Sequence, residues 1–385
     1  MGAGIAQLAV EAGLETVGRE VTAELGEKAR GRIDHFLKRK VEKGQIESYD
    51  IGLLSTTTDV ADFADCDVVI EAIVEELAPK QELFAALEQV CRADAVLATN
   101  TSALSVTEIA GAVSTPERVV GMHFFNPAPL MPLVEIVRAE RSSDEAFDTA
   151  FALGEKLGKH PIRCHDTPGF VVNRVLIPLL NDCVRVLDEA RVTPEDLDAG
   201  MKHGAGWPMG PCELVDLVGI DIHVHASEAL WEKLREPRMA PPARLVAMAN
   251  AGLLGRKSGR GFYVYDPKAR AGGKVVNRDA YQYAGGRTRK VLPDGEIAER
   301  VALLMVNEAA HCLGEGIIAS ARDGDVGAVL GLGFPPFRGG PFHYVDTVGA
   351  ATIVEKLQSW AQVRGPRFLP APVLCDVAAR RQRFY

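Results

Sequence analysis

Short apolar runs alternate with helical patterns over the first 140 residues of this 385-residue chain, and this alternation limits the possible folds more than any other feature. A strand–helix alternation predicts a parallel, doubly wound α/β sheet with helices on both of its faces. A helical pattern begins at the first residue, and further helical patterns follow the apolar runs. The predicted strands are residues 15–19, 52–56, 67–72, 96–100 and 119–124, and the predicted helices are 22–43, 79–91 and 105–110.

Charge and cysteine content exclude several classes of protein. The 43 basic and 52 acidic side chains give a net charge of −9, which argues against nucleic acid or an anionic membrane as the main partner. The longest uncharged stretch, residues 119–134, is interrupted by prolines and is too short to span a bilayer. The seven cysteines lie far apart without a CxxC pair, so we expect a cytoplasmic protein with neither disulfide nor metal.

The strand signals fade after about residue 144, where long helical patterns take over. We therefore expect a domain boundary within residues 140–165. A stretch rich in Gly, Lys and Arg resembles a linker. The predicted organisation is an α/β domain over 1–143, a helical domain over 144–265, a linker over 266–292 and a second helical domain over 293–385.

The two segments that flank the linker resemble each other. NRVLIPLLNDCVRVLDEA, from Asn173, aligns with ERVALLMVNEAAHCLGEG, from Glu299, and GAGWP (204–208) aligns with GLGFP (331–335). The offset between aligned positions is 126 to 127 residues. It becomes 130 where GP..LVDLVG (210–219) is aligned with GP..YVDTVG (340–349). Such a constant offset predicts two copies of one helical unit that pack together.

Ligands of open α/β sheets bind beyond the carboxyl ends of the strands, so the residues there are the first candidates. Glu20 follows the second expected strand of a nucleotide-binding sheet, eighteen residues after Gly2. A carboxylate at that place can accept both ribose hydroxyls of NAD and repels the 2′-phosphate of NADP; the alternative is an ordinary surface glutamate. Of a G-x-G-x-x-G fingerprint only MGAG is present, so Gly2 serves at most as its last glycine, the one that permits close helix packing.

Small polar residues follow the predicted strand at 96–100. Asn100, Thr101 and Ser102 come directly after it, and Ser105 can cap the next helix. Helix capping explains any one of these residues. Because three polar residues stand together, some of them are candidates for contact with a ligand.

His123 and Glu135 stand in two apolar, strand-like runs twelve residues apart. A buried carboxylate needs a partner, and if that partner is His123, the pair forms a base suited to take a proton from a substrate hydroxyl. The alternative is a satisfied histidine of the core. Asn173, in the first turns of a helix opened by Pro168 and Gly169, is a poor helix residue. It either contacts a ligand or ties the domains together.

Four segments closely resemble the motifs of L-3-hydroxyacyl-CoA dehydrogenases: NTSALS, GMHFFNPAPLMPLVEIV, DTPGFVVNRV and GWPMGPCELVDLVGID. The linker and second helical unit resemble the C-terminal part of the bacterial multifunctional α-subunits of the fatty acid oxidation complex. The resemblance covers nearly the whole chain. It implies a Rossmann-like domain followed by two all-α C-terminal units, and oxidation of a 3-hydroxyacyl-CoA to the 3-keto form with NAD in fatty acid β-oxidation.

The resemblance also assigns roles to individual residues. It implies His123 as the general base, Glu135 as its orienting carboxylate, and Ser102 and Asn173 as the groups that hold the substrate oxygens. Glu20 stands where the family usually has Asp for the adenosine ribose. Lys43 and Lys257 match basic positions near the phosphates of CoA or of the cofactor. The remaining positions that match the cofactor site are Met1, Gly2, Ile73, Val74, Glu75, Lys80, Ser102 and Asn126.

The chain departs from the family pattern at its beginning. The family carries a strand and a GxG turn before the residues that match Met1 and Gly2. Without them we expect unpaired inner edges on the two neighbouring strands, and we expect the chain to be a truncated dehydrogenase. Two alternatives stay open: a non-catalytic module that binds acyl-CoA or a thiolase β-subunit, and another β-hydroxyacid dehydrogenase, a group that generally relies on a lysine base.

Overall fold

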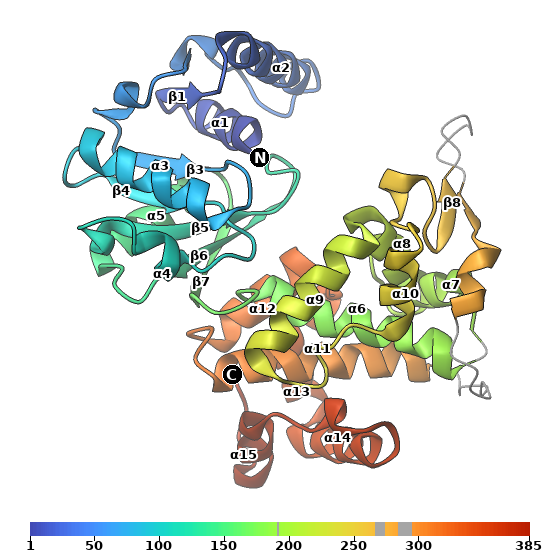
Figure 1. Ribbon diagram of the computed structural model, residues 1–385. Coiled ribbons are helices and arrows are strands. Elements are labelled where there is room, and N and C mark those ends of the chain that lie inside the picture. Colours follow the sequence, from blue (N-terminus) through green and yellow to red (C-terminus); the bar gives the residue numbers. More distant parts are fainter. Residues whose placement is uncertain (191, 266–273, 284–294) are drawn as a thin grey trace. The chain divides into compact units, whose positions relative to one another are not determined.

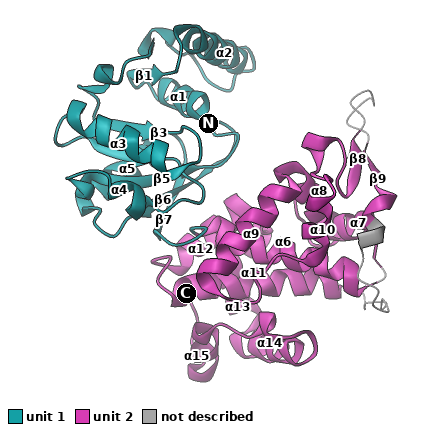
Figure 2. Cartoon of the chain, in the orientation of Figure 1, with its two compact units in different colours: residues 1–170 teal, residues 171–385 magenta. Residues whose placement is uncertain are grey.

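The computed structural model describes residues 1–190, 192–265, 274–283 and 295–385 (Figure 1). The chain forms two compact units, Met1–Phe170 and Val171–Tyr385 (Figure 2). The boundary expected at residue 143 lies too early. Helix α5 (Asp144–Lys156) and strand β7 (His160–His165) still belong to the first unit, because β7 adds to its sheet and α5 packs on that sheet.

The first unit contains the predicted alternation of strands and helices, with ends that differ from the predicted ones by at most two residues. Its strands are β1 (Thr16–Arg19), β2 (Leu54–Thr57), β3 (Val68–Glu71), β4 (Val96–Thr99), β5 (Val119–Phe124), β6 (Leu133–Arg138) and β7. Its helices are α1 (Gly2–Glu11), α2 (Ala23–Glu42), α3 (Leu77–Val90), α4 (Val106–Ala110) and α5. Ser105 caps α4 as expected, since its side chain accepts a hydrogen bond from the Glu108 N–H.

The strands of this unit lie in two separate sheets. One has the order β3-β4-β5-β6-β7 and the other pairs β1 with β2 in parallel. Among the described residues β1 therefore pairs only with β2, and β3 only with β4, so the expectation of unpaired inner edges is confirmed. Helix α1 connects the two sheets: Ile5 and Leu8 pack in the core of the larger sheet, and Val10 packs with α2 and β2.

Strand β6 runs antiparallel to β5, whereas the other pairs of the larger sheet are parallel. The five strands predicted within residues 15–124 pair in parallel as expected, and β6, which was not among them, is the antiparallel exception. Only residues 125–132 connect the two strands, and a connection of that length is too short for a parallel crossover. The antiparallel register places His123 opposite Glu135.

Close packing at the start of α1 involves Gly4 rather than Gly2. A methyl group at Gly4 would lie 3.1 Å from Cδ of Pro129, whereas one at Gly2 would meet nothing within 4 Å. The helix-packing role expected of Gly2 therefore belongs to Gly4 in this structure.

The second unit is mostly helical. Its helices are α6 (Val172–Glu189), α7 (Pro194–Ala199), α8 (Pro211–Val218), α9 (Ile220–Leu234), α10 (Ala243–Asn250), α11 (Glu296–Gly314), α12 (Ala321–Leu332), α13 (Pro341–Val348), α14 (Ala350–Arg364) and α15 (Pro372–Arg380). It is not purely α, because β8 (Tyr263–Tyr265) and β9 (Lys274–Val276) form an antiparallel pair. Strand β9 and a 3-10 helix (Arg278–Tyr283) lie within the predicted linker. Residues 266–273 and 284–292 of that linker lie outside the described residues.

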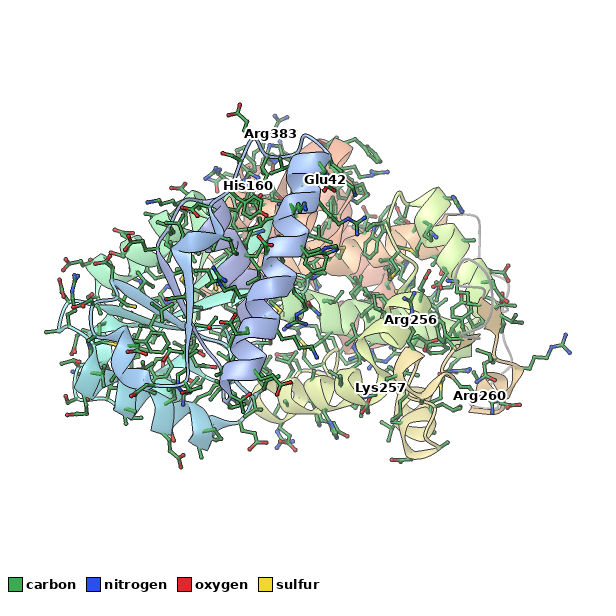
Figure 3. The ribbon with its side chains drawn as sticks, turned by 90° about the horizontal axis from the view of Figure 1, so that it is seen from above. Glu42, His160, Arg256, Lys257, Arg260 and Arg383 are labelled. Atoms are coloured by element: carbon green, nitrogen blue, oxygen red, sulfur yellow. The ribbon has the colours of Figure 1, made fainter. Side chains whose placement is uncertain are left out.

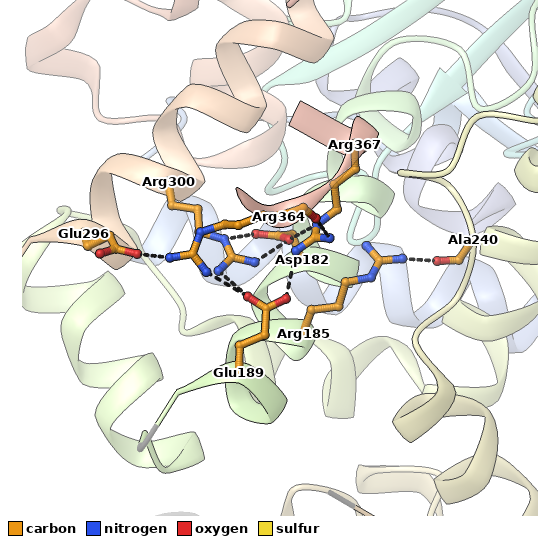
Figure 4. Close-up of polar contacts among 8 residues, drawn as sticks. All are labelled: Asp182, Arg185, Glu189, Ala240, Glu296, Arg300, Arg364 and Arg367. Atoms are coloured by element: carbon orange, nitrogen blue, oxygen red, sulfur yellow. Dashed lines mark hydrogen bonds and ion pairs between the residues drawn. The ribbon is translucent and has the colours of Figure 1, made fainter. Parts of the chain in front are cut away.

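The two copies of the helical repeat pack as one compact unit rather than as two domains. Arg174 of the first copy binds Glu308 and Glu315 of the second, and Arg300 of the second binds Asp182 and Glu189 of the first. These are equivalent positions in the alignment, so the contacts are reciprocal. Arg364 and Arg367 join Arg300 around the same two carboxylates (Figure 4).

In the described part of the chain, none of the helices is both long and apolar enough to cross a membrane.

Candidate active site

His123 and Glu135 form a buried pair in the middle of the β5–β6 ladder. Nδ1 of His123 lies 2.6 Å from Oε2 of Glu135, and both side chains are almost entirely inaccessible to solvent. An ionised carboxylate only accepts hydrogen bonds, so Nδ1 carries the proton and donates it. The pairing expected from the sequence is confirmed, and the lone pair of the ring is left on Nε2.

Two aromatic rings surround the histidine. The ring centroids of Phe125 and Phe170 lie 4.6 and 5.7 Å from that of His123. Apolar rings exclude water, which strengthens the attraction between the Glu135 carboxylate and an imidazolium on His123. The pair is thus arranged to accept a proton at Nε2 and to stabilise the resulting charge.

Ser102 lies in a turn beyond the end of β4, and one carboxylate holds that turn. Oε1 of Glu75 accepts hydrogen bonds from the Thr101 hydroxyl (2.6 Å), the Ser102 N–H (2.7 Å) and the Ala103 N–H (3.1 Å). Burial tends to raise the pKa of Glu75, but these hydrogen bonds and the charge of Lys80 outweigh it, so the pKa is lowered. Glu75 is therefore an anion that orders the Ser102 turn.

The neighbouring residue Asn100 connects this turn to the strand of the histidine. Its Oδ1 accepts a hydrogen bond of 2.8 Å from the N–H of Phe124, the residue after His123. The amide side chain thereby continues the contact between β4 and β5 beyond their ladder. The side chain of Asn100 is thus bonded to the backbone of β5. The side chain of Ser102, by contrast, is exposed.

Lys80 is buried, although it was expected to line a cofactor. Its Nζ lies 2.6 Å from Oε1 of Glu71 and 3.3 Å from Oε2 of Glu75. Lys80 is therefore not an exposed cation, and its contact with Glu75 links it to the Ser102 turn. Ile73, Val74 and Asn126 are exposed, and their contact with a cofactor stays a prediction.

Sequence reasoning missed Glu71, the buried carboxylate that binds Lys80. It ends the apolar strand β3 and accepts hydrogen bonds from Lys80, from Thr99 and from the Ile73 N–H. The signal that identified Glu135, an acid within an apolar strand, was present at Glu71 as well.

Three further candidate residues belong to other elements of the chain. Lys43 directly follows α2 and is exposed. Lys257 lies in the second unit near Arg256 and Arg260 (Figure 3), and its Nζ is 2.6 Å from Oδ2 of Asp221. Asn173 is the second residue of α6, also in the second unit; this helix begins at Val172 and not at Pro168, because the chain turns through Gly169 and Phe170 at positive φ. The predicted approach of Asn173 to Ser102 and His123 stays a prediction.

Two family descriptions match the chain. The NAD-binding domain of 3-hydroxyacyl-CoA dehydrogenase matches residues 1–167, and the C-terminal domain of the same enzymes matches residues 169–265 and 295–383. The chain belongs to the 3-hydroxyacyl-CoA dehydrogenase family. The two matches of the C-terminal domain coincide with the two copies of the helical repeat.

Solved structures of this family resemble the dehydrogenase over all or part of its length. A 3-hydroxybutyryl-CoA dehydrogenase from Escherichia coli is 30% identical, with a TM-score of 0.87, over 99% of this chain and 96% of that one. The dehydrogenase part of multifunctional enzyme 1 from C. elegans is 26% identical, with a TM-score of 0.68, over 98% and 86%. The (S)-3-hydroxybutyryl-CoA dehydrogenase PaaH1 from Ralstonia eutropha is 36% identical, with a TM-score of 0.66, over 69% and 95%.

NAD is the cofactor of this dehydrogenase family, and several features of the first unit fit it. Glu20 directly follows β1 and is partly exposed, so its carboxylate is accessible to a ribose. No side chain caps the N-terminus of α1, where backbone N–H groups are suited to a phosphate. The exposed apolar side chains of Val21 and Val74 suit a flat base. The residues present therefore fit the cofactor.

Proposed function

We propose that this dehydrogenase oxidises (S)-3-hydroxyacyl-CoA to 3-ketoacyl-CoA with NAD, and that the first unit carries the proton-accepting group. The observation that carries the proposal is the 2.6 Å contact between His123 and Glu135 in an apolar surrounding. Oxidation of a hydroxyl to a ketone requires removal of one proton and one hydride. A buried histidine with its Nδ1–H held by a carboxylate is suited to the first of these.

In the proposed mechanism, Nε2 of His123 takes the proton of the 3-hydroxyl. Glu135 keeps the ring in one tautomer and stabilises the imidazolium, which lowers the barrier to that proton transfer. NAD, when bound, supplies the hydride acceptor. Ser102, held by Glu75, and Asn173 are the proposed groups that orient the substrate oxygens.

The remaining cofactor and substrate contacts are part of the same proposal. Glu20 binds the adenosine ribose, the start of α1 with Met1 and Gly2 faces the pyrophosphate, and Lys43 and Lys257 attract phosphates. The other proposed cofactor contacts are Ile73, Val74, Glu75, Ser102 and Asn126, and Lys80 contributes through Glu75.

We place the reaction in fatty acid β-oxidation in the cytoplasm, with a thiolase β-subunit as the partner that takes the 3-ketoacyl product. The support for this context is the tandem helical repeat. The linker and second helical unit resemble the C-terminal part of the bacterial multifunctional α-subunits. Co-purification with a thiolase, followed by transfer of acetoacetyl-CoA between the two, tests it. Absence of an association at micromolar concentrations would contradict it.

The test of the activity is oxidation of NADH by acetoacetyl-CoA, the reverse reaction, followed by the loss of NADH absorbance. We expect turnover that depends on both substrates and is lost in His123→Ala. A chain that binds NADH and acetoacetyl-CoA without turnover would contradict the proposal.

A second candidate function is binding of acyl-CoA without catalysis, and one observation favours it. Strands β1 and β3 pair with no common neighbour among the described residues, so the sheet that should support the cofactor is divided. Activity should be measured for this chain and for a version to which a strand and a GxG turn are added before Met1. Activity in this chain contradicts the second candidate, and activity only in the extended version supports it for the chain as it stands.

A further inference from the structure

The carboxylate of Glu71 is fully buried and has three different partners. Its Oε1 accepts hydrogen bonds from the Ile73 N–H (2.7 Å) and from Nζ of Lys80 (2.6 Å), and its Oε2 accepts one from the Thr99 hydroxyl (2.7 Å). These partners come from the turn after β3, from α3 and from the end of β4. A buried charge with one counter-ion and two further donors is stabilised in one geometry.

Lys80 lies between this carboxylate and a second one. The side chain of Lys80 is 1% exposed, that of Glu71 is not exposed, and that of Glu75 is 41% exposed. The ammonium group is closer to Glu71, at 2.6 Å, than to Glu75, at 3.3 Å. Glu71 therefore sets the place of the ammonium group, and the ammonium group attracts Glu75 from there.

Glu75 in turn determines the geometry of the turn that carries Ser102. Three donors of this turn, the Thr101 hydroxyl and the N–H groups of Ser102 and Ala103, converge on its Oε1. The other oxygen of Glu75 contacts Lys80. The two oxygens of one carboxylate thus join the buried lysine to the Ser102 turn.

We infer that Glu71 is a positioning residue for Ser102, acting through Lys80 and Glu75. Its side chain bonds neither to the Ser102 turn nor to Ser102, Asn173 or His123, the groups proposed to meet the substrate. It acts by neutralising Lys80 at the buried end of the series, which leaves Glu75 free to accept from the turn. With Glu71 uncharged, the ammonium group moves toward Glu75, and Glu75 is drawn away from the Ser102 and Ala103 N–H groups. The catalytic consequence of this inference rests on the proposed function, whereas its structural part does not.

Glu71→Gln is the appropriate variant, because it keeps the shape and the hydrogen-bonding capacity of the side chain. The Gln oxygen can still accept from Ile73, and its amide can donate to the Thr99 hydroxyl, so mainly the charge opposite Lys80 is lost. Glu88→Gln is a matched control from the same unit. Glu88 also orders a turn, by accepting hydrogen bonds from the N–H and hydroxyl groups of Ser114 and Thr115, but it has no link to Lys80.

The first readout is amide hydrogen exchange of the full chain without ligands, followed by mass spectrometry of peptides that span residues 100–104 and 113–116. In Glu71→Gln we expect exchange at Ser102 and Ala103 to accelerate about tenfold, the size that corresponds to a weakened charged hydrogen bond. The 113–116 peptide should not change. Glu88→Gln should show the opposite pattern. Unchanged exchange at 100–104 in folded Glu71→Gln overturns the inference.

The second readout is a double-mutant cycle on kcat in the form of the enzyme that is active. Glu71→Gln should lower kcat about tenfold when Ser102 is present and less than about twofold in a Ser102→Ala background, because the group it positions is then absent. Glu88→Gln should leave kcat unchanged. Equal losses of kcat in both backgrounds overturn the inference.

If Glu71→Gln accelerates exchange throughout the first unit, Lys80→Met tests the same series from its middle. In a Lys80→Met background, Glu71→Gln should accelerate exchange at 100–104 by less than about twofold, because the ammonium group that draws Glu75 away is then absent. An acceleration of about tenfold in that background overturns the inference. If the unmodified chain and its extended version both lack dehydrogenase activity, the proposed function fails. The exchange experiment still decides whether Glu71 positions the Ser102 turn.

Discussion

Arg174 and Arg300 occupy equivalent positions in the two copies of the helical repeat, and each binds the acidic pair of the other copy. Arg174 binds Glu308 and Glu315, while Arg300 binds Asp182 and Glu189. A surface that contacts its own equivalent by reciprocal pairs is the arrangement found in symmetric dimers. Here one chain supplies both halves of it.

The reciprocal pairs predict the effect of Arg300→Met on stability. Burial tends to raise the pKa of Asp182, but the charge of Arg300 outweighs it and lowers the pKa, so Asp182 is an anion. Removal of Arg300 leaves that anion buried with Arg367 at 3.0 Å. We expect a loss of about 3 kcal/mol in the free energy of unfolding, measured with urea. The control is Arg260→Met, which removes an exposed pair with Asp279 and should cost less than about 1 kcal/mol. Similar losses in both variants would contradict this account.

His123→Ala tests the role of the buried histidine. We expect kcat to fall by a factor of about 10² to 10⁴, because the variant lacks the group that accepts the proton. The dissociation constant for NADH should change little, since His123 contacts Glu135 and two aromatic rings. Steady-state kinetics and NADH fluorescence measure the two quantities. An unchanged kcat would remove His123 from the mechanism.

Gly121→Ala tests the packing that supports the His123–Glu135 pair. A methyl group at Gly121 would lie 2.7 Å from Cβ of Val137 and 3.0 Å from Cγ2 of Val106, within the β5–β6 ladder. We expect destabilisation by about 1–3 kcal/mol from overpacking. Gly31→Ala, in α2 where a methyl group meets nothing within 4 Å, should instead stabilise by about 0.5–1 kcal/mol. Thermal unfolding measures both, and a neutral Gly121→Ala would show that the ladder can relax.

Glu88 predicts a pH dependence of stability. Burial tends to raise its pKa, but hydrogen bonds from the Ser114 N–H and from Thr115 outweigh it and lower the pKa to about 2, from an ordinary value of 4.5. A lowered pKa stabilises the folded state above pH 4.5, and this contribution is lost as the pH falls toward about 2. Wild type should therefore be more stable than Glu88→Gln at pH 7, and the difference should shrink below pH 4.5. A constant difference in unfolding midpoints between pH 7 and pH 3 would exclude this role of Glu88.

The strands of the first unit and the partnership of His123 with Glu135 were accessible from local pattern. Apolar runs of strand length, and the cost of an unpaired acid within one of them, are properties of short segments. Glu71 was accessible by the same argument but was not singled out. The boundary at 143 was wrong because α5 and β7 look like the start of a helical region, and only their packing on the larger sheet assigns them to the first unit.

By itself, then, the sequence determined the alternating elements, the tandem repeat, the acid–histidine pair and the family, since each depends on residue order and spacing. Only the tertiary structure decided that β5 and β6 are antiparallel, that Gly4 rather than Gly2 is closely packed, that Glu71 holds Lys80, and that the two repeats exchange ion pairs. Each of these depends on which distant side chains and strands meet. Such contacts arise from packing and burial, which no local pattern encodes.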